Sequence, residues 1–419
     1  DVGLLLLLFT IGLKLDVRSI VRPEVWAPTV VHMALVVGGL SMVLFGLART
    51  GLPPFDALSF ESLLVVAFAL SFSSTVFAVK VLEARGDMAA LYGQVAVGVL
   101  VVQDVVAVVF LAASTGKIPA PWAILVLGLP LLRPVFNDLL ERCGHGELLV
   151  LAGVVFALGS AMLFEAVGLK DGLGAIAAGA VLGPLPSGRE LAKSMIGLKD
   201  VLLVGFFLSV GLTGMPTLEA MLIAAAFLLF LPLKSALFFL LFTRFRLRAR
   251  SSWLSALSLG NFSEFGLIVA TLGVQKGWLD SSWLIGLAIA LALSFAVAAP
   301  INARAATFYQ LLHDRLLRFE RPERLALEQP MDASDAEVLI FGMGRIGTGA
   351  YDHMRSVHGD AVIGFDVDED TLALHREAGR RVQRASATDG DLWERLHIDP
   401  ARVELVMLTM PSLEENIEA

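Results

Sequence analysis

The sequence predicts a polytopic α-helical membrane protein followed by a small α/β cytoplasmic domain. The chain has 419 residues, of which 56% are hydrophobic and only 17% charged, whereas soluble domains are about one quarter charged. Apolar runs long enough to cross a hydrocarbon core of about 30 Å recur up to residue 302 and then stop. A glycine-rich pattern between a strand and a helix follows near residue 342, as in nucleotide-binding folds.

Apolar segments predict membrane helices at 1–14, 26–48, 60–82, 91–113, 122–137, 147–168, 172–184, 201–215, 218–243, 253–275 and 282–302. Basic residues gather in alternate connections: Lys14, Arg18, Arg22, Arg85, Arg142, Arg189, Lys193, Lys199, Arg244, Arg246, Arg248 and Arg250. Loops rich in Lys and Arg stay on the cytoplasmic side. We therefore expect everything after residue 302 to be cytoplasmic.

The two ends of the sequence predict missing parts. Asp1 is followed at once by a leucine-rich run, as though a membrane helix were entered partway, and no signal peptide precedes it. The last residues end before a nucleotide-binding fold is complete. The single cysteine, Cys143, excludes an intramolecular disulfide and a cysteine-rich metal site. Nothing in the composition suggests nucleic-acid binding.

Residues 303–335 are expected to link two domains. Arginines among phenylalanines and leucines in 303–320 predict an amphipathic helix leaving the membrane. The polar, proline-containing stretch after it marks a boundary. The domains are thus a membrane domain at 1–302 and a Rossmann-like nucleotide-binding domain at 336–419.

A dinucleotide-binding fingerprint opens the second domain. The apolar run 338–341 predicts a buried strand, the glycine loop 342–347 follows it, and a second strand at 361–365 ends in Asp366. Gly342 would make the tight turn, Gly344 would let the backbone approach a phosphate, and Gly347 would let the helix pack on the strand.

The predicted ligand of this loop is an adenine nucleotide: AMP, ATP or NAD(H). The binding residues would be Gly342, Gly344, Arg345, Ile346 and Gly347, with Asp366 accepting hydrogen bonds from ribose hydroxyls. Val367 follows Asp366 and no arginine lies near, so a 2′-phosphate is not favoured. The alternative is a structural turn with an empty site. No candidate hydride-transfer residue follows, so the nucleotide would be a regulatory ligand rather than a substrate.

Ionisable residues inside membrane segments are costly and indicate function. Asp104 lies past the middle of its apolar segment, where a carboxylate can hold a proton and a desolvated cation in turn. Its alternative role is a structural carboxyl group between helices. Lys234 and Glu264 are also intramembrane; their alternatives are an ion pair or snorkelling lysine and a helix-breaking polar bend.

Two polar interruptions predict broken helices. Ser73, Ser74 and Thr75 interrupt one apolar span, and the stretch 260–264 interrupts another. Paired interruptions are typical of inverted-repeat transporters, in which two discontinuous helices cross at the ion site. Serine and threonine packing between helices is the competing explanation for the first.

The chain resembles the cation:proton antiporter 2 family, and within it the Kef-type potassium/proton antiporters. The resemblance is carried by 8–16, 70–75, 103–104, 174–179, 205–211, 260–265 and the loop 342–347. It implies a homodimer in the bacterial inner membrane, transported K⁺ or Na⁺ at Asp104 and Gln103, and an ancillary cytoplasmic regulator. Where Kef proteins carry an acidic regulatory loop, residues 187–200 here are mixed in charge, which argues against glutathione gating.

These observations together predict a nucleotide-regulated potassium/proton antiporter working by alternating access, and not an enzyme. A sodium/proton exchanger is the alternative within the same class. A nucleotide-gated potassium channel is a further alternative, although no filter sequence of the Thr-Val-Gly-Tyr-Gly kind occurs.

Overall fold

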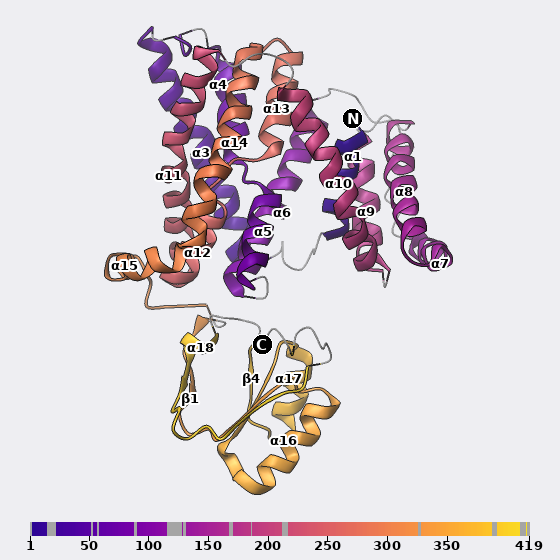
Figure 1. Cartoon of the computed structure of the whole chain (residues 1–419), viewed down its shortest axis with the longest axis vertical. Coiled ribbons are helices and arrows are strands. Elements are labelled where there is room, and N and C mark those ends of the chain that lie inside the picture. The colour runs from indigo at the N-terminus through magenta and orange to yellow at the C-terminus, as the bar shows by residue number, and fades with distance from the viewer. Residues whose placement is uncertain are drawn as a thin grey trace. The chain divides into compact units, whose positions relative to one another are not determined.

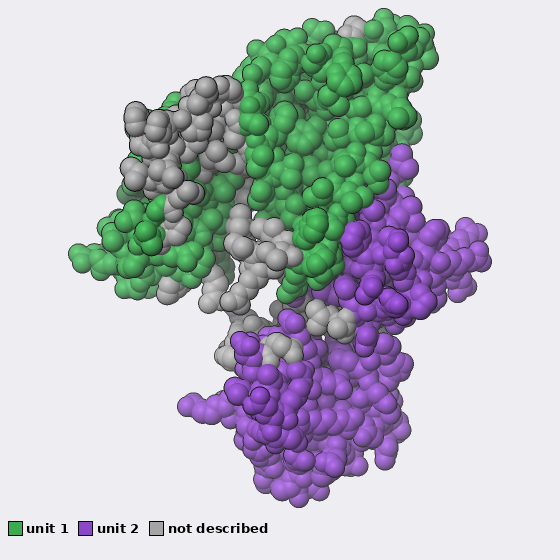
Figure 2. Space-filling view, turned by 180° about the vertical axis from the view of Figure 1, so that it is seen from behind, with its two compact units in different colours: residues 1–74, 98–232, 261–296 green, residues 75–97, 233–260, 297–419 purple. Residues whose placement is uncertain are grey.

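The structure is a computed structural model of the whole chain. It describes residues 2–14, 22–51, 53–56, 58–87, 90–114, 128, 131–166, 171–185, 187–211, 217–325, 328–387, 392–410 and 416. The chain divides into two compact units, coloured separately in Figure 2. The first comprises 1–74, 98–232 and 261–296, and the second 75–97, 233–260 and 297–419.

Helices, most of them apolar, make up most of the described part of residues 2–303 (Figure 1). In order they are α1 Val2–Lys14, α3 Pro23–Arg49, α4 Phe60–Ser71, α5 Thr75–Arg85, α6 Leu91–Ala113, α7 Arg133–Cys143, α8 Glu147–Ala166, α9 Asp171–Leu182, α10 Gly188–Gly211, α11 Leu218–Arg244, α12 Ala249–Ser258, α13 Glu264–Gln275 and α14 Ser281–Ala303. Among the described residues, five stretches are long and apolar enough to cross a membrane: Pro23–Arg49, Phe60–Arg85, Glu147–Ala166, Leu218–Arg244 and Ser281–Ala303.

Small residues let some of these helices touch through their backbones. A Cβ atom on Gly12 of α1 would meet the carbonyl oxygen of Ile176 in α9, and one on Gly179 of α9 would meet the carbonyl oxygen of Phe9. Close backbone approach through glycine is the usual way in which membrane helices pack, since lipid supplies no hydrophobic drive between them. The α1–α9 pair is therefore specified by its glycines.

Two segments differ from the sequence prediction. The helix predicted at 201–215 begins at Gly188 as α10, because hydropathy marks only the apolar part of a helix whose first turns carry charged residues such as Glu190 and Lys193. Residues 212–215 lie outside the described part. Of the predicted segment 122–137, residues 122–127, 129 and 130 also lie outside it, and the helix described there is α7, which extends to Cys143.

The linker and the second domain follow. Helix α15 is Ala305–Leu317, and the further elements are β1 Met331–Ala333, β2 Val338–Phe341, α16 Arg345–His358, β3 Val362–Asp366, α17 Glu369–Glu377, β4 Val382–Arg384, α18 Leu392–Arg395, β5 Leu396–Ile398 and β6 Leu405–Leu408. Strands β4, β3, β2 and β6 form a parallel sheet in that order, and β1 pairs with β5.

The centre of this sheet is apolar on both faces. All the residues of β2 are buried, as expected for a parallel strand covered on both sides. Phe341 at its end is in register with Phe365 of β3, and the two rings stack with centroids 4.8 Å apart. The carboxyl ends of β2 and β3 thereby hold the glycine loop and Asp366 at one edge of the sheet.

Candidate functional site

The first broken helix is held open by Gln103. Helix α4 ends at Ser71 and α5 begins at Thr75, so the last carbonyl groups of α4 and the first N–H groups of α5 have no partner within a helix. The side-chain oxygen of Gln103 accepts a hydrogen bond from the Ser73 N–H at 2.9 Å, and its amide nitrogen donates to the Ser71 carbonyl oxygen at 3.2 Å. Gln103 is fully buried, and it replaces hydrogen bonds that the break removes.

The second break lies between α12 and α13 and contacts the first. The side-chain oxygen of Asn261 accepts a hydrogen bond from the Ser74 N–H at 2.7 Å. The Phe262 N–H donates to the Ser294 hydroxyl of α14 at 3.1 Å, and Ser263 caps α13 by accepting from the Phe265 N–H. Both breaks occur where the polar stretches predicted them.

The half-helices pack closely in each unit. In the first unit, a Cβ atom on Gly266 of α13 would lie 2.5 Å from the carbonyl oxygen of Ala69 in α4, so the two backbones are in direct contact. In the second unit, α5 packs against α12. Only a glycine permits the α4–α13 approach.

The predicted charged residues occupy the interior. Asp104 is 2% exposed and follows Gln103 in α6; Glu264 is 2% exposed and opens α13. Thus Asp104 and Glu264 each adjoin, in the chain, a residue that holds or caps a break. Lys234 is fully buried in α11 and belongs to the second unit. Thr75 begins α5 and is half-buried.

No cluster of three or more histidine, cysteine or acidic residues that could hold a metal occurs in the described part of the chain. Helix α6 and the second break instead carry two buried carboxylates, those of Asp104 and Glu264, and the breaks add hydroxyl, amide and backbone oxygens. Oxygen atoms of this kind can replace the hydration shell of a monovalent cation.

The glycine loop has the conformation that the fingerprint predicts. Gly342 has a φ of +93°, in the region that favours glycine, and a Cβ atom there would crowd Thr409 and Met410. A Cβ atom on Gly347 would meet the Gly342 carbonyl oxygen. Gly344 forms the N-cap of α16, with open space around a Cβ atom.

Exposed backbone at the start of α16 makes an anion site available. Gly344, Arg345 and Ile346 are exposed, whereas Gly347 is buried. The Asp366 carboxylate accepts hydrogen bonds from the Met343 N–H at 2.6 Å and the Asp368 N–H at 2.9 Å. Asp366 therefore fixes the loop itself, and only the remaining lone pairs of its oxygens can serve a ribose.

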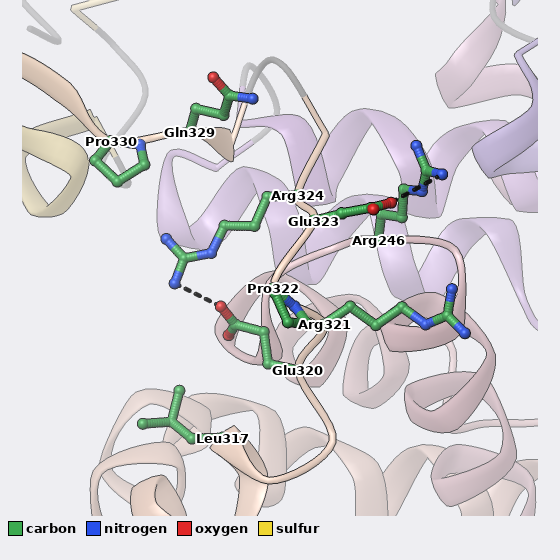
Figure 3. Close-up of a pocket in the computed structure, with 9 residues that line it drawn as sticks. All are labelled: Arg246, Leu317, Glu320, Arg321, Pro322, Glu323, Arg324, Gln329 and Pro330. Carbon is green, nitrogen blue, oxygen red and sulfur yellow. Dashed lines mark ion pairs between the residues drawn. The ribbon is translucent and has the colours of Figure 1, made fainter.

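Carboxylates of the linker cap the first turn of α12. The Ala249 N–H donates to Glu320 at 2.8 Å, and the Arg248 N–H donates to Glu328. Two ion pairs, Arg324 with Glu320 and Arg246 with Glu323, line an open pocket there (Figure 3). The first N–H groups of a helix have no partner within it and attract negative charge, so the linker stabilises α12.

Glu328 is the buried member of this cap, with 2% exposure. Burial raises the pKa of Glu328 above its usual value, while hydrogen bonds from Ser251 and Arg248 and the charges of Arg248 and Arg395 act in the opposite direction. Arg395 belongs to α18 of the second domain and is itself buried. Glu328 thus interacts with residues of both α12 and α18.

Sequence reasoning missed several of these residues. Asn261 lay within a stretch singled out for its polarity, but its pairing with Ser74 could not be read from the chain. Ser294 is a lone serine in an apolar span and gave no signal. Glu328 is one acid in a polar linker. Its importance comes from burial, which the local sequence does not encode.

Comparison with known proteins identifies the family of the membrane domain. Residues 1–305 match the profile described as sodium/hydrogen exchanger, transmembrane. The chain belongs to the sodium/hydrogen exchanger family. The prediction of a transporter rather than an enzyme is confirmed by this membership. Residues 338–419 of this exchanger match the TrkA-N domain, a nucleotide-binding fold, in agreement with the predicted Rossmann-like domain.

Curated relatives of this exchanger include glutathione-regulated potassium-efflux system proteins KefC. The one from Cronobacter sakazakii is 26% identical over 447 residues, and the one from Klebsiella pneumoniae is 27% identical over 451 residues. Each alignment covers 100% of this chain and 68% of the relative. The resemblance to Kef-type antiporters is thereby confirmed.

Proposed function

We propose that this exchanger moves K⁺ and H⁺ in opposite directions across a bacterial inner membrane as a homodimer, with Asp104 binding the two ions in turn. The observation that carries the proposal is the bridge from Gln103 to Ser73 and Ser71. It joins the helix that bears Asp104 to an unwound segment. A buried carboxylate beside unwound backbone can bind a dehydrated cation, and it can bind a proton when the cation leaves.

Alternating access follows from the two breaks. In this proposal the fold is an inverted repeat in which α4–α5 and α12–α13 are the two discontinuous helices. The hydrogen bond from Ser74 to Asn261 keeps the breaks together while other helices move. Glu264 and Lys234 would set the local charge, and Thr75 would add a hydroxyl oxygen near the break.

Potassium is proposed as the cargo because the relatives are named as potassium-efflux proteins. Proteoliposomes loaded with a pH-sensitive dye test this. External K⁺ should drive proton movement at least about tenfold faster than the same concentration of Na⁺. This ratio corresponds to a difference of about 1.4 kcal/mol in activation free energy. Faster exchange with Na⁺ would make the protein a sodium/proton exchanger instead.

Regulation is proposed to run through the linker. An adenine nucleotide on the loop from Gly342 to Gly347 would shift the conformational equilibrium of the second domain. Glu328 interacts with Arg395 and caps α12, so it would transmit this conformational change to the second broken helix. We do not propose glutathione as a regulatory ligand, because residues 187–200 lack the acidic run of the Kef regulatory loop.

A further inference from the structure

Helix α15 carries a mixed apolar and basic face that the transport proposal does not use. Another face of the helix packs on α12: Ala305, Tyr309 and Leu316 are buried, and the Ala305 carbonyl oxygen accepts a hydrogen bond from the Trp253 indole at 3.0 Å. This packing fixes the rotation of α15 about its axis. The remaining faces of the helix therefore have defined directions.

One of these faces combines bulky apolar and basic side chains. Phe308 is 36% exposed and Leu311 is 75% exposed. Arg304, Arg315 and Arg318 lie at helical spacing from them, and all three are exposed. None of these guanidinium groups forms an ion pair with any residue the structure describes. Gln310 and His313 lie on another side of the helix, away from this stripe.

The position of α15, directly after a helix that can span a membrane, indicates what contacts this face. The helix begins two residues after α14, which is long and apolar enough to cross a membrane. It runs across the direction of the end of α14 (Figure 1). A helix that leaves a membrane span and turns aside lies at the interface, where phenylalanine and leucine enter the acyl region and arginine stays among the headgroups.

We propose that this face of α15 lies on the membrane surface and binds anionic phospholipid headgroups. The unpaired arginines provide charge complementarity to phosphate, and each basic residue near an anionic leaflet adds to the attraction. Leu311 and Phe308 supply the apolar anchor. Because the linker after α15 caps α12, the lipid contact fixes one end of that linker.

Site-specific fluorescence tests whether this face of α15 lies in the membrane interface. In full-length protein with Cys143 replaced by serine, an environment-sensitive NBD label goes on Leu311→Cys or, as the matched control, on His313→Cys. The variants are reconstituted in phosphatidylcholine vesicles containing phosphatidylglycerol, and brominated lipid is the quencher. We expect quenching at position 311 at least about threefold stronger than at 313. Equal quenching at both positions, or none at either, would overturn the proposal.

A second experiment tests whether the arginines of α15 recognise anionic lipid. Omitting phosphatidylglycerol should weaken quenching at position 311, and the variant R304Q/R315Q/R318Q should no longer respond to phosphatidylglycerol, with the same variant in pure phosphatidylcholine as its reference. Quenching at 311 that is indifferent to phosphatidylglycerol in the parent protein would contradict anionic recognition. Transport activity is not needed for either readout, so failure here is separate from failure of the antiporter proposal.

Discussion

The side-chain oxygen of Asn261 accepts a hydrogen bond from the backbone N–H of Ser74 at 2.7 Å. The two residues are far apart in the chain, and each lies in the break of a different helix. Both are fully buried. This bond therefore satisfies a backbone donor that has no helical partner, and it ties one break to the other.

Asn261→Ala should destabilise the protein by about 1–3 kcal/mol, because it leaves the buried Ser74 N–H without an acceptor. It should also slow exchange, since the breaks would no longer be held together. Thermal unfolding of the purified protein and proton movement in proteoliposomes measure the two effects. The control Gln310→Ala removes an exposed amide and should change stability by less than about 0.5 kcal/mol. An Asn261→Ala protein as stable as this control would refute the role.

Gly344→Ala should abolish nucleotide binding without disturbing the fold. A Cβ atom at Gly344 meets nothing within 4 Å in the protein, but it would stand where the backbone must approach a phosphate. Gly349→Ala in the same helix is the matched control, because a Cβ atom there also has open space. Calorimetry with AMP, ATP and NADH on the full chain measures binding. Equal affinity in both variants would place the nucleotide elsewhere.

Glu328→Gln should flatten the dependence of stability on pH. Because burial raises the pKa of Glu328 above 4.5, the folded protein holds this proton more tightly than the unfolded chain. The stabilising contribution is thus full below the unfolded pKa and is lost as the pH rises through the raised one. Glutamine keeps an acceptor for the Arg248 N–H but does not titrate.

Thermal unfolding from about pH 4 to about pH 8 measures this effect. The variant should gain stability relative to the parent as the pH rises. Glu377→Gln changes an exposed acid and should keep the parent slope. Parallel profiles for the parent and Glu328→Gln would show that Glu328 is not a buried titrating group.

Exchange should be electrically silent. If Asp104 alone trades one proton for one cation, and Lys234 takes no part in the proton exchange, equal charge moves in each direction. Imposing a membrane potential without a pH gradient, and then adding K⁺, should leave the rate of internal pH change unaltered. A rate that rises steeply with voltage would mean that Lys234 also releases a proton.

The sequence predicted features that are local. Polar residues within apolar spans predicted both helix breaks, and the glycine spacing predicted the turn at Gly342, because each depends on a few consecutive residues. The partners of the breaks were not predictable, since Asn261 and Ser294 reach them only through tertiary packing. The same holds for Glu328, which becomes a buried cap of α12 only when the linker folds back. The start of α10 was missed because charged residues extend a helix beyond its apolar part.

The most direct test of the transport proposal is Asp104→Asn. An amide is close in shape to the carboxyl group but cannot take up and release a proton. Asp280→Asn, which changes an exposed acid between α13 and α14, is the matched control. In proteoliposomes with a K⁺ gradient, Asp104→Asn should reduce proton movement to the level of protein-free vesicles while unfolding at a temperature close to that of the parent, and Asp280→Asn should exchange normally. Parent-level proton movement by folded Asp104→Asn would contradict the assignment of Asp104 as the ion carrier.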